Sequence, residues 1–103
     1  MDNEVREVSP EELEKDLDGA QKYNIVDVRE TEEVETGMIP GAKHLSLGTL
    51  PEHVEGFNKE EEYVMVCRSG RRSHNACLFL QEHGIKAYNL QSGMLDWTGE
   101  KVF

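Results

Sequence analysis

Hydrophobic residues follow two different periods along the chain, one typical of helices and one typical of strands. Residues 9–12 (SPEE) combine a capping box with a proline in the first turn, and Leu13 and Leu17 then recur at helical spacing before Gly19. This pattern predicts a first helix. Short runs rich in apolar and β-branched residues predict strands. These runs are residues 23–28, 43–47, 63–66 and 86–90.

Helical patterns lie between the predicted strands. The longest has an apolar arc at residues 76–80, wide enough to pack against a sheet, and Gly84 as its C-cap. Shorter helical stretches are predicted at residues 30–36, at residues 49–57 and in a closing turn at residues 93–97, where Trp97 is a predicted core anchor. Because strands and helices alternate, the pattern predicts one three-layer α/β domain over residues 1–103 with a mainly parallel sheet. The most apolar strand, 63–66, is expected at its centre.

The balance of charge restricts the partners that the protein can have. The chain has 103 residues and a formal net charge of −10, which disfavours nucleic acid and anionic membranes as partners. Residues 1–66 hold 18 acids and 6 bases, whereas residues 67–103 hold 3 acids and 5 bases. The acidic beginning of the chain lacks the features of a secretory signal, so we expect a cytoplasmic protein that binds a small anion near its local cluster of bases.

That cluster of bases surrounds a cysteine at the end of the most apolar predicted strand. Cys67 opens the segment CRSGRRS, in which Arg68, Arg71 and Arg72 supply positive charge and Gly70 supplies backbone freedom. Neighbouring cations and a helix N-terminus both favour the reactive thiolate, and successive amide N–H groups can form an anion-binding nest. We therefore interpret Cys67 as a nucleophile rather than a buried structural thiol.

This interpretation makes specific demands on the structure. The Cys67 side chain must not be sealed from solvent, and the turn that follows must point N–H bonds inward rather than carbonyls. Ser73 is predicted to be the N-cap of the next helix. Cys77 lies in an apolar helical segment and is predicted to be a packed core thiol. Neither the cysteines nor the four histidines show metal-ligand spacing, so we predict no metal and no cofactor.

Several segments together resemble a known family, the single-domain rhodaneses, which are sulfurtransferases that carry sulfane sulfur as a cysteine persulfide. The similar segments are the active-site loop CRSGRRS at residues 67–73, the upstream segments DVRE at 27–30 and GMIPGA at 37–42, and the C-terminal segment SGMLDW at 92–97. The chain departs from the family pattern at Met38, where histidine is commoner, and at Ser92, where glycine is commoner. The resemblance implies a rhodanese-like fold, with a five-stranded sheet flanked by helices on both faces.

The resemblance also implies a chemical role for the loop. The Cys67 thiolate would take sulfur from a small anionic donor such as thiosulfate and pass it to cyanide or to a thiol, including a protein thiol. The residues expected to bind substrate are Arg68, Ser69, Gly70, Arg71, Arg72 and Ser73. Among them, Arg68 and Arg72 are the best candidates to hold the donor's oxyanion, and Arg71 is expected to be a rim charge.

Two residues of an earlier strand are expected to support this loop. By the resemblance, Asp27 and Arg29 brace it through ion pairing or hydrogen bonds. In this interpretation the cysteine loop is open to solvent. We therefore expect a monomer that meets its partners through this loop.

Other functions are compatible with parts of this pattern. A non-enzymatic rhodanese-like docking module and a dedicated persulfide relay both fit the same fold. A cysteine-dependent phosphatase would need an arginine at the sixth position after the cysteine, and Ser73 occupies that position. Arg72 lies one residue too early, so the spacing favours a loop sized for sulfur over one sized for phosphate.

Overall fold

The computed structural model describes residues 4–103 and has a single five-stranded sheet in the order β1-β5-β4-β2-β3. Each pair of neighbouring strands is parallel. The strands are β1 (Glu7–Val8), β2 (Tyr23–Asp27), β3 (Lys43–His44), β4 (Glu62–Val66) and β5 (Lys86–Leu90). As predicted, β4 lies at the centre, so the loop that follows it emerges from the middle of the sheet.

Alternate residues of β4 enter two separate hydrophobic cores. Tyr63 and Met65 pack on one face with residues of the later helices, whereas Val64 and Val66 pack on the other face with Leu13. Because both faces of a parallel strand are covered, its residues form a continuous apolar run rather than an alternating one. This explains why the segment is the most apolar strand of the sequence.

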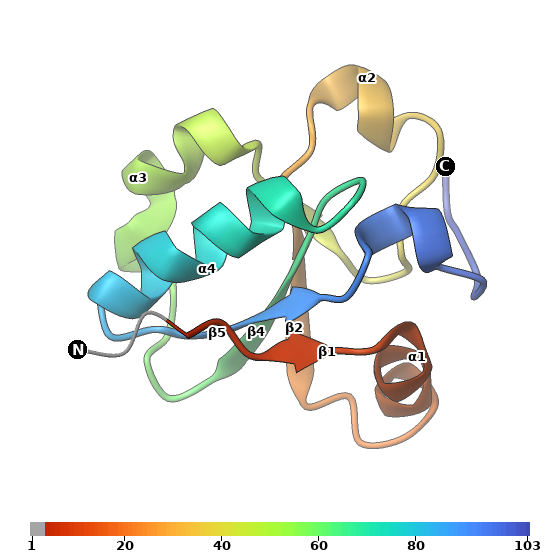
Figure 1. The fold of residues 1–103 in the computed structure, drawn as a ribbon, viewed down its shortest axis with the longest axis horizontal. Helices are drawn as coiled ribbons and strands as arrows, with labels where there is room; N and C mark the ends of the chain where they lie inside the picture. Colours follow the sequence, from red (N-terminus) through yellow and green to blue (C-terminus); the bar gives the residue numbers. More distant parts are fainter. Residues whose placement is uncertain (1–3) are drawn as a thin grey trace.

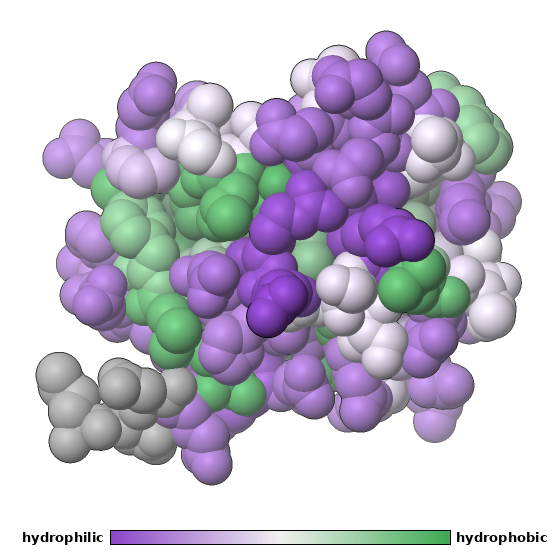
Figure 2. Space-filling model, turned by 45° about the horizontal axis from the view of Figure 1, so that its top comes forward, coloured by the Kyte–Doolittle hydropathy of each residue, from purple (hydrophilic) through white to green (hydrophobic). Residues whose placement is uncertain are grey.

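The helices form the two outer layers. Figure 1 shows α3 and α4 above the sheet and α1 below it. The α-helices are α1 (Pro10–Asp18), α2 (Thr31–Val34), α3 (Leu50–His53) and α4 (Arg71–Glu82), and the 3₁₀ turns are η1 (Leu47–Thr49), η2 (Val54–Gly56) and η3 (Gly93–Asp96). In Figure 2 the surface is strongly hydrophilic near its centre, with hydrophobic residues gathered mainly over the region of α3 and α4. The prediction of a three-layer α/β fold is confirmed.

The start of α1 matches the sequence prediction. Ser9 accepts a hydrogen bond from the Glu12 amide at 3.1 Å, and the Glu12 carboxylate accepts one from the Ser9 amide at 3.0 Å. These paired bonds lower the pKa of Glu12 below its ordinary value, chiefly through the bond from the Ser9 amide. Both orphan amide groups are satisfied locally, so this helix start could be identified without tertiary information.

Other predicted bounds were wrong in detail. The predicted strand at 43–47 has only Lys43 and His44 in the sheet, and the predicted helix at 49–57 is divided into the tail of η1, then α3 and η2. β1 was not predicted from the pattern, because two residues are too few to show a period. Its pairing with β5 supplies the fifth strand that the family resemblance implied.

Candidate active site

Cys67 lies directly after β4, at the carboxyl end of the central strand, where parallel α/β sheets bind their ligands. The chain then turns through Gly70, whose φ of +100° is a left-handed conformation suited to glycine. Gly70 precedes the first residue of α4, Arg71. The prediction that Ser73 caps this helix was wrong, because the helix begins two residues earlier and Ser73 is buried inside its first turn.

The loop directs hydrogen-bond donors at the sulfur of Cys67. The Gly70 amide donates to Sγ at 3.0 Å, and the Ser73 hydroxyl lies 3.2 Å from Sγ. Burial by itself raises the pKa of the Cys67 thiol. The Ser73 hydroxyl and the backbone amides of Ser73, Gly70 and Ser69 outweigh that effect, and the pKa is lowered below its ordinary value. The expectation that N–H groups rather than carbonyls face the sulfur is confirmed.

The expectation of an open thiol was wrong. Cys67 is 0% exposed, because the turn closes around the sulfur that its amides bind and because Cys67 continues the packed face of β4. Arg68 and Ser69, the next two residues, are exposed. A reagent can therefore reach the sulfur only after the loop or its side chains move.

The second cysteine differs in its surroundings although it is equally buried. Cys77 lies on the buried side of α4 and packs in the core, as predicted. Burial, with a smaller effect of the nearby Cys67, raises the pKa of Cys77 to about 12. Among residues 4–103 no hydrogen-bond donor offsets this desolvation, so Cys77 stays a neutral thiol, whereas the donors around Cys67 favour its ionisation.

Arg72 is held by a carboxylate in an ion pair. Its two terminal nitrogens donate to the Glu33 oxygens of α2 at 2.7 and 2.8 Å. The side-chain bond from Arg72 and the backbone bond from Glu30 lower the pKa of Glu33 from 4.5 to about 2. Arg72 therefore reaches any donor oxyanion only by releasing Glu33. Sequence reasoning did not identify Glu33, because it is one of several acids in a short polar run.

Asp27 and Arg29 form a buried pair at the end of β2. Arg29 contacts the Asp27 carboxylate through Nε and Nη2, at 2.9 and 2.8 Å to its two oxygens. The guanidinium also donates to the carbonyls of Glu33 and Gly37. These bonds fix α2 and the segment after it. Through the Glu33–Arg72 ion pair, α2 is in turn joined to the start of α4. The side-chain hydrogen bonds of Arg29 therefore reach the Cys67 loop only by way of α2, and the supporting role of Asp27 and Arg29 stays a prediction.

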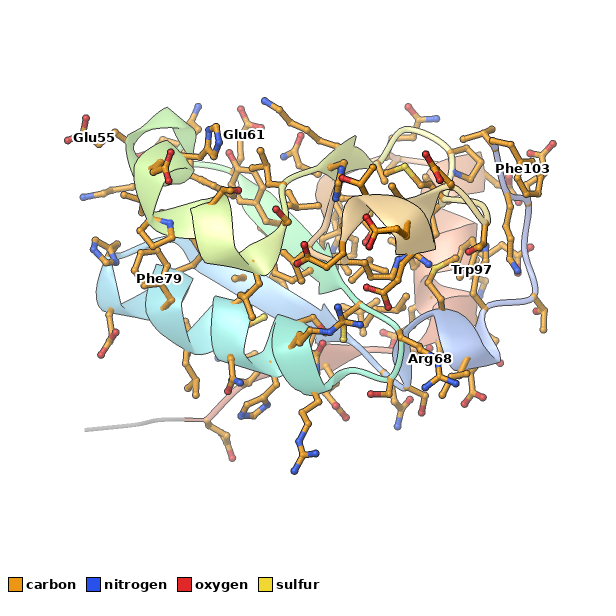
Figure 3. The ribbon with its side chains drawn as sticks, turned by 90° about the horizontal axis from the view of Figure 1, so that it is seen from above. Glu55, Glu61, Arg68, Phe79, Trp97 and Phe103 are labelled. Atoms are coloured by element: carbon orange, nitrogen blue, oxygen red, sulfur yellow. The ribbon has the colours of Figure 1, made fainter. Side chains whose placement is uncertain are left out.

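Arg68 and Arg71 are exposed at the mouth of the loop. Arg68 lines a hollow of about 410 Å³ together with Met94, Leu95 and Lys101. In Figure 3, Arg68 lies between the start of α4 and the η3 turn, far from Phe79 near the other end of α4. Arg68 and Arg71 therefore place exposed positive charge beside Cys67. This agrees with the local cluster of bases that the sequence shows around the cysteine.

The η3 turn is fastened to the backbone of the cysteine loop. The Met94 amide donates to the Cys67 carbonyl at 2.9 Å, and the Leu95 amide donates to the Arg68 carbonyl at 3.0 Å. A Cβ at Gly93 would lie 2.4 Å from the Cys67 carbonyl oxygen, closer than two such atoms can approach. Gly93 permits this contact, which explains why a glycine follows Ser92 in the C-terminal segment.

A family model described as "Rhodanese-like domain" matches residues 9–100. The chain belongs to the rhodanese-like domain family. This rhodanese-like chain is 44% identical over 97 residues to YtwF of Bacillus subtilis (strain 168), a candidate sulfurtransferase, and the match covers 94% of each chain. It is 35% identical over 74 residues to the thiosulfate sulfurtransferase GlpE of Coxiella burnetii (strain RSA 331 / Henzerling II), covering 71% of this chain and 69% of that protein.

A solved structure is similar to this chain in both fold and sequence. The crystal structure of a rhodanese-like domain protein from Staphylococcus aureus superposes with a TM-score of 0.88 at 38% identity, covering 93% of this chain and 94% of that one. Within residues 4–103 of the rhodanese-like chain, no helix has the length and apolar character needed to cross a membrane. In the same residues, no group of three or more histidines, cysteines or acids is arranged to hold a metal ion.

Proposed function

We propose that this member of the rhodanese-like sulfurtransferase family moves sulfane sulfur through a persulfide on Cys67. The Cys67 thiolate attacks the outer sulfur of thiosulfate, forms a new S–S bond, and releases sulfite with the electron pair of the broken bond. An acceptor thiolate or cyanide then attacks the terminal sulfur, takes it, and returns Cys67 as a thiolate. Each step exchanges one bond to sulfur for another, so no external oxidant or reductant is needed.

The observation that carries this proposal is the set of donors around Sγ. A buried cysteine in an apolar site has a raised pKa, as Cys77 does, whereas the amides and the hydroxyl near Cys67 lower its pKa despite its burial. The same donors suit the negative terminal sulfur of a persulfide. The name of the relative GlpE, a thiosulfate sulfurtransferase, supports thiosulfate as the first donor to test.

The arginines have different parts in this proposal. Arg68 and Arg71 are exposed and free to meet the donor's sulfonate oxygens, whereas Arg72 binds the donor only if it leaves Glu33. Arg68 is therefore the first choice as the oxyanion-binding residue, and Arg72 serves mainly to fix the start of α4 beneath the loop. A cytoplasmic location and a monomeric state stay predictions.

The burial of Cys67 favours one competing function, a docking module whose thiol performs no chemistry. Intact-protein mass spectrometry after incubation with thiosulfate separates the two possibilities. We expect the wild type to gain the mass of one sulfur atom and to lose it again with cyanide. The Cys67→Ser variant should gain nothing, and the matched Cys77→Ser variant should load like the wild type.

Three results would count against this assignment. If Cys77→Ser lost sulfur loading and Cys67→Ser retained it, the reactive cysteine would be Cys77 and the assignment to Cys67 would be wrong. Absence of loading in the folded wild type would favour docking alone. Hydrolysis of an aryl phosphate ester without sulfur loading would favour a cysteine-dependent phosphatase, the function that the loop spacing disfavours.

A further inference from the structure

Asn89 is a buried polar residue of β5 whose side chain contacts the cysteine loop from the neighbouring strand. It is 2% exposed and pairs in register with Met65 of β4. Its Nδ2 donates to the Gly70 carbonyl at 2.9 Å. Because a carbonyl oxygen only accepts hydrogen bonds, this contact fixes the orientation of the amide, and Oδ1 must face Ser73. The asparagine thereby anchors the turn and presents an acceptor to the hydroxyl beside the sulfur.

The Ser73 hydroxyl has one proton and two possible acceptors. Its oxygen lies 2.5 Å from Asn89 Oδ1 and 3.2 Å from Cys67 Sγ. When Cys67 is a thiol, its S–H can donate to the Ser73 oxygen while the Ser73 hydroxyl donates to Asn89, so all three groups are satisfied. When Cys67 is a thiolate, the hydroxyl must turn toward the sulfur. Asn89 Oδ1 then loses its donor in a buried site, which costs free energy.

A persulfide removes this conflict. In Cys–S–S⁻ the negative charge lies mainly on the terminal sulfur, and Sγ carries two covalent bonds and little charge. The Ser73 hydroxyl can then return to Asn89 while backbone amides of the loop bind the terminal sulfur. We propose that Asn89 is a positioning residue which, by competing for the Ser73 hydroxyl, favours the thiol and persulfide forms of Cys67 over the free thiolate. The claim that Asn89 favours the persulfide over the thiolate rests on the proposed function. The claim that it favours the thiol over the thiolate does not.

The other side chains that act on the sulfur make no hydrogen bond to Asn89 among residues 4–103. Arg72 of α4 favours the thiolate but is largely neutralised by Glu33 of α2, and Cys77 of α4 is uncharged. The Asp27–Arg29 pair at the end of β2 carries no net charge. None of these side chains contacts Asn89 among the hydrogen bonds of residues 4–103. A change in Cys67 ionisation on replacing Asn89 must therefore come through Ser73 or through the Gly70 anchor.

A double-mutant cycle separates those two routes. Thiolate absorbance is followed from pH 4 to 9 in the wild type, Asn89→Leu, Ser73→Ala and the double variant. Cys77, with a pKa raised to about 12, stays protonated throughout this range. We expect Asn89→Leu to move the Cys67 midpoint to lower pH, so that the thiolate fraction below the midpoint rises roughly threefold to tenfold. In the Ser73→Ala background the same substitution should change nothing.

Two outcomes would overturn the proposal. An equal shift in both backgrounds would mean that Asn89 acts only through the Gly70 anchor, and an upward shift or no shift in the wild-type background would mean that it does not compete for the hydroxyl. Thermal unfolding checks that each variant is folded, and Asn89→Ala replaces Asn89→Leu in the cycle if leucine is not tolerated.

The effect of Asn89 on the persulfide is measured separately. In thiosulfate–sulfite mixtures, we expect Asn89→Leu to lower the ratio of persulfide to thiolate by the same factor by which it raises the thiolate fraction. An unchanged ratio would overturn the claim that Asn89 favours the persulfide. If the wild type does not load sulfur at all, the proposed function fails, while the titration still decides whether Asn89 controls the thiol.

Discussion

Ser92 has a backbone conformation that suits glycine better than serine. Its φ is +60°, in the left-handed region, and its side chain makes no capping hydrogen bond to η3. A left-handed conformation costs an L-residue other than glycine roughly 1–2 kcal/mol. The family's preference for glycine at this position therefore has a physical reason in this chain, which carries the strain because the turn places η3 against the cysteine loop.

Replacing this serine should stabilise the protein. We expect Ser92→Gly to raise the free energy of unfolding by about 0.5–1 kcal/mol, because relief of strain exceeds the added entropy of the unfolded glycine. Urea unfolding measures the change. The matched control is Ser46→Gly, at a position with φ of −58°, where the same substitution should lower stability. A loss of stability in Ser92→Gly would show that the left-handed turn is not strained.

The two cysteines show that the residue type alone does not determine the acidity of a thiol. Both are buried, yet the pKa of Cys67 is lowered and that of Cys77 is raised to about 12. The difference comes from donors within hydrogen-bonding distance of one sulfur and their absence, among the described residues, near the other. Position at the end of β4, rather than residue type, makes Cys67 the candidate nucleophile.

At the scale of elements, α2 depends on its contacts for stability. It has four residues, too few to persist by backbone hydrogen bonding alone. Arg29 binds the carbonyl of Glu33 from within the fold, and Arg72 binds the Glu33 carboxylate from α4. This short helix therefore connects the Asp27–Arg29 pair to Arg72 in the first turn of α4.

Removing the Glu33–Arg72 ion pair should weaken the packing of α2 against α4. We expect Glu33→Gln to lower the free energy of unfolding near pH 7 by about 0.5–1 kcal/mol, the range of a partly exposed ion pair. The pKa of Glu33 is lowered from 4.5 to about 2, so the carboxylate stabilises the fold above pH 4.5 and loses that contribution as pH falls through 2. The difference between variant and wild type should therefore shrink on acidification, as measured by urea unfolding.

A neighbouring acid provides the control for this change. Glu32 is exposed on the same helix and has no ion pair within residues 4–103 that the structure describes, so Glu32→Gln should leave stability nearly unchanged. A destabilisation of Glu33→Gln that persists undiminished at pH 2 would mean that the carboxylate charge is not its source.

The elements that the sequence could predict are those with local causes. The start of α1 follows from bonds between Ser9 and Glu12, and β4 follows from its own apolar run. The start of α4 was misplaced because the left-handed turn at Gly70 replaces a capping side chain, and nothing local distinguishes that turn. Glu33 and Asn89 were missed because their partners lie 39 and 16 to 19 residues away along the chain. Such pairings depend on the assembled fold.

At the scale of the whole molecule, two electrostatic fields act on an anionic donor. The protein has a formal net charge of −10, whereas Arg68 and Arg71 lie exposed beside the thiol. For a dianion about 20 Å from the centre, the net charge opposes approach by about 4 kcal/mol in unscreened water. An arginine at about 6 Å attracts it by only about 1.4 kcal/mol. The net charge therefore governs approach at low salt, and the arginines govern binding at contact.

Inert salt should consequently accelerate loading by thiosulfate. Between about 10 and 150 mM, the Debye length falls from about 30 to 8 Å, which screens the net charge more than it screens contacts at the loop. We expect the second-order loading rate, followed by mass spectrometry at a pH where Cys67 is ionised, to rise several-fold. Iodoacetamide, an uncharged reagent for the same thiol, is the control, and its rate should stay nearly constant. A thiosulfate rate that falls with salt would mean that the local arginines already dominate the field at a distance, and that this acidic molecule attracts its donor rather than repelling it.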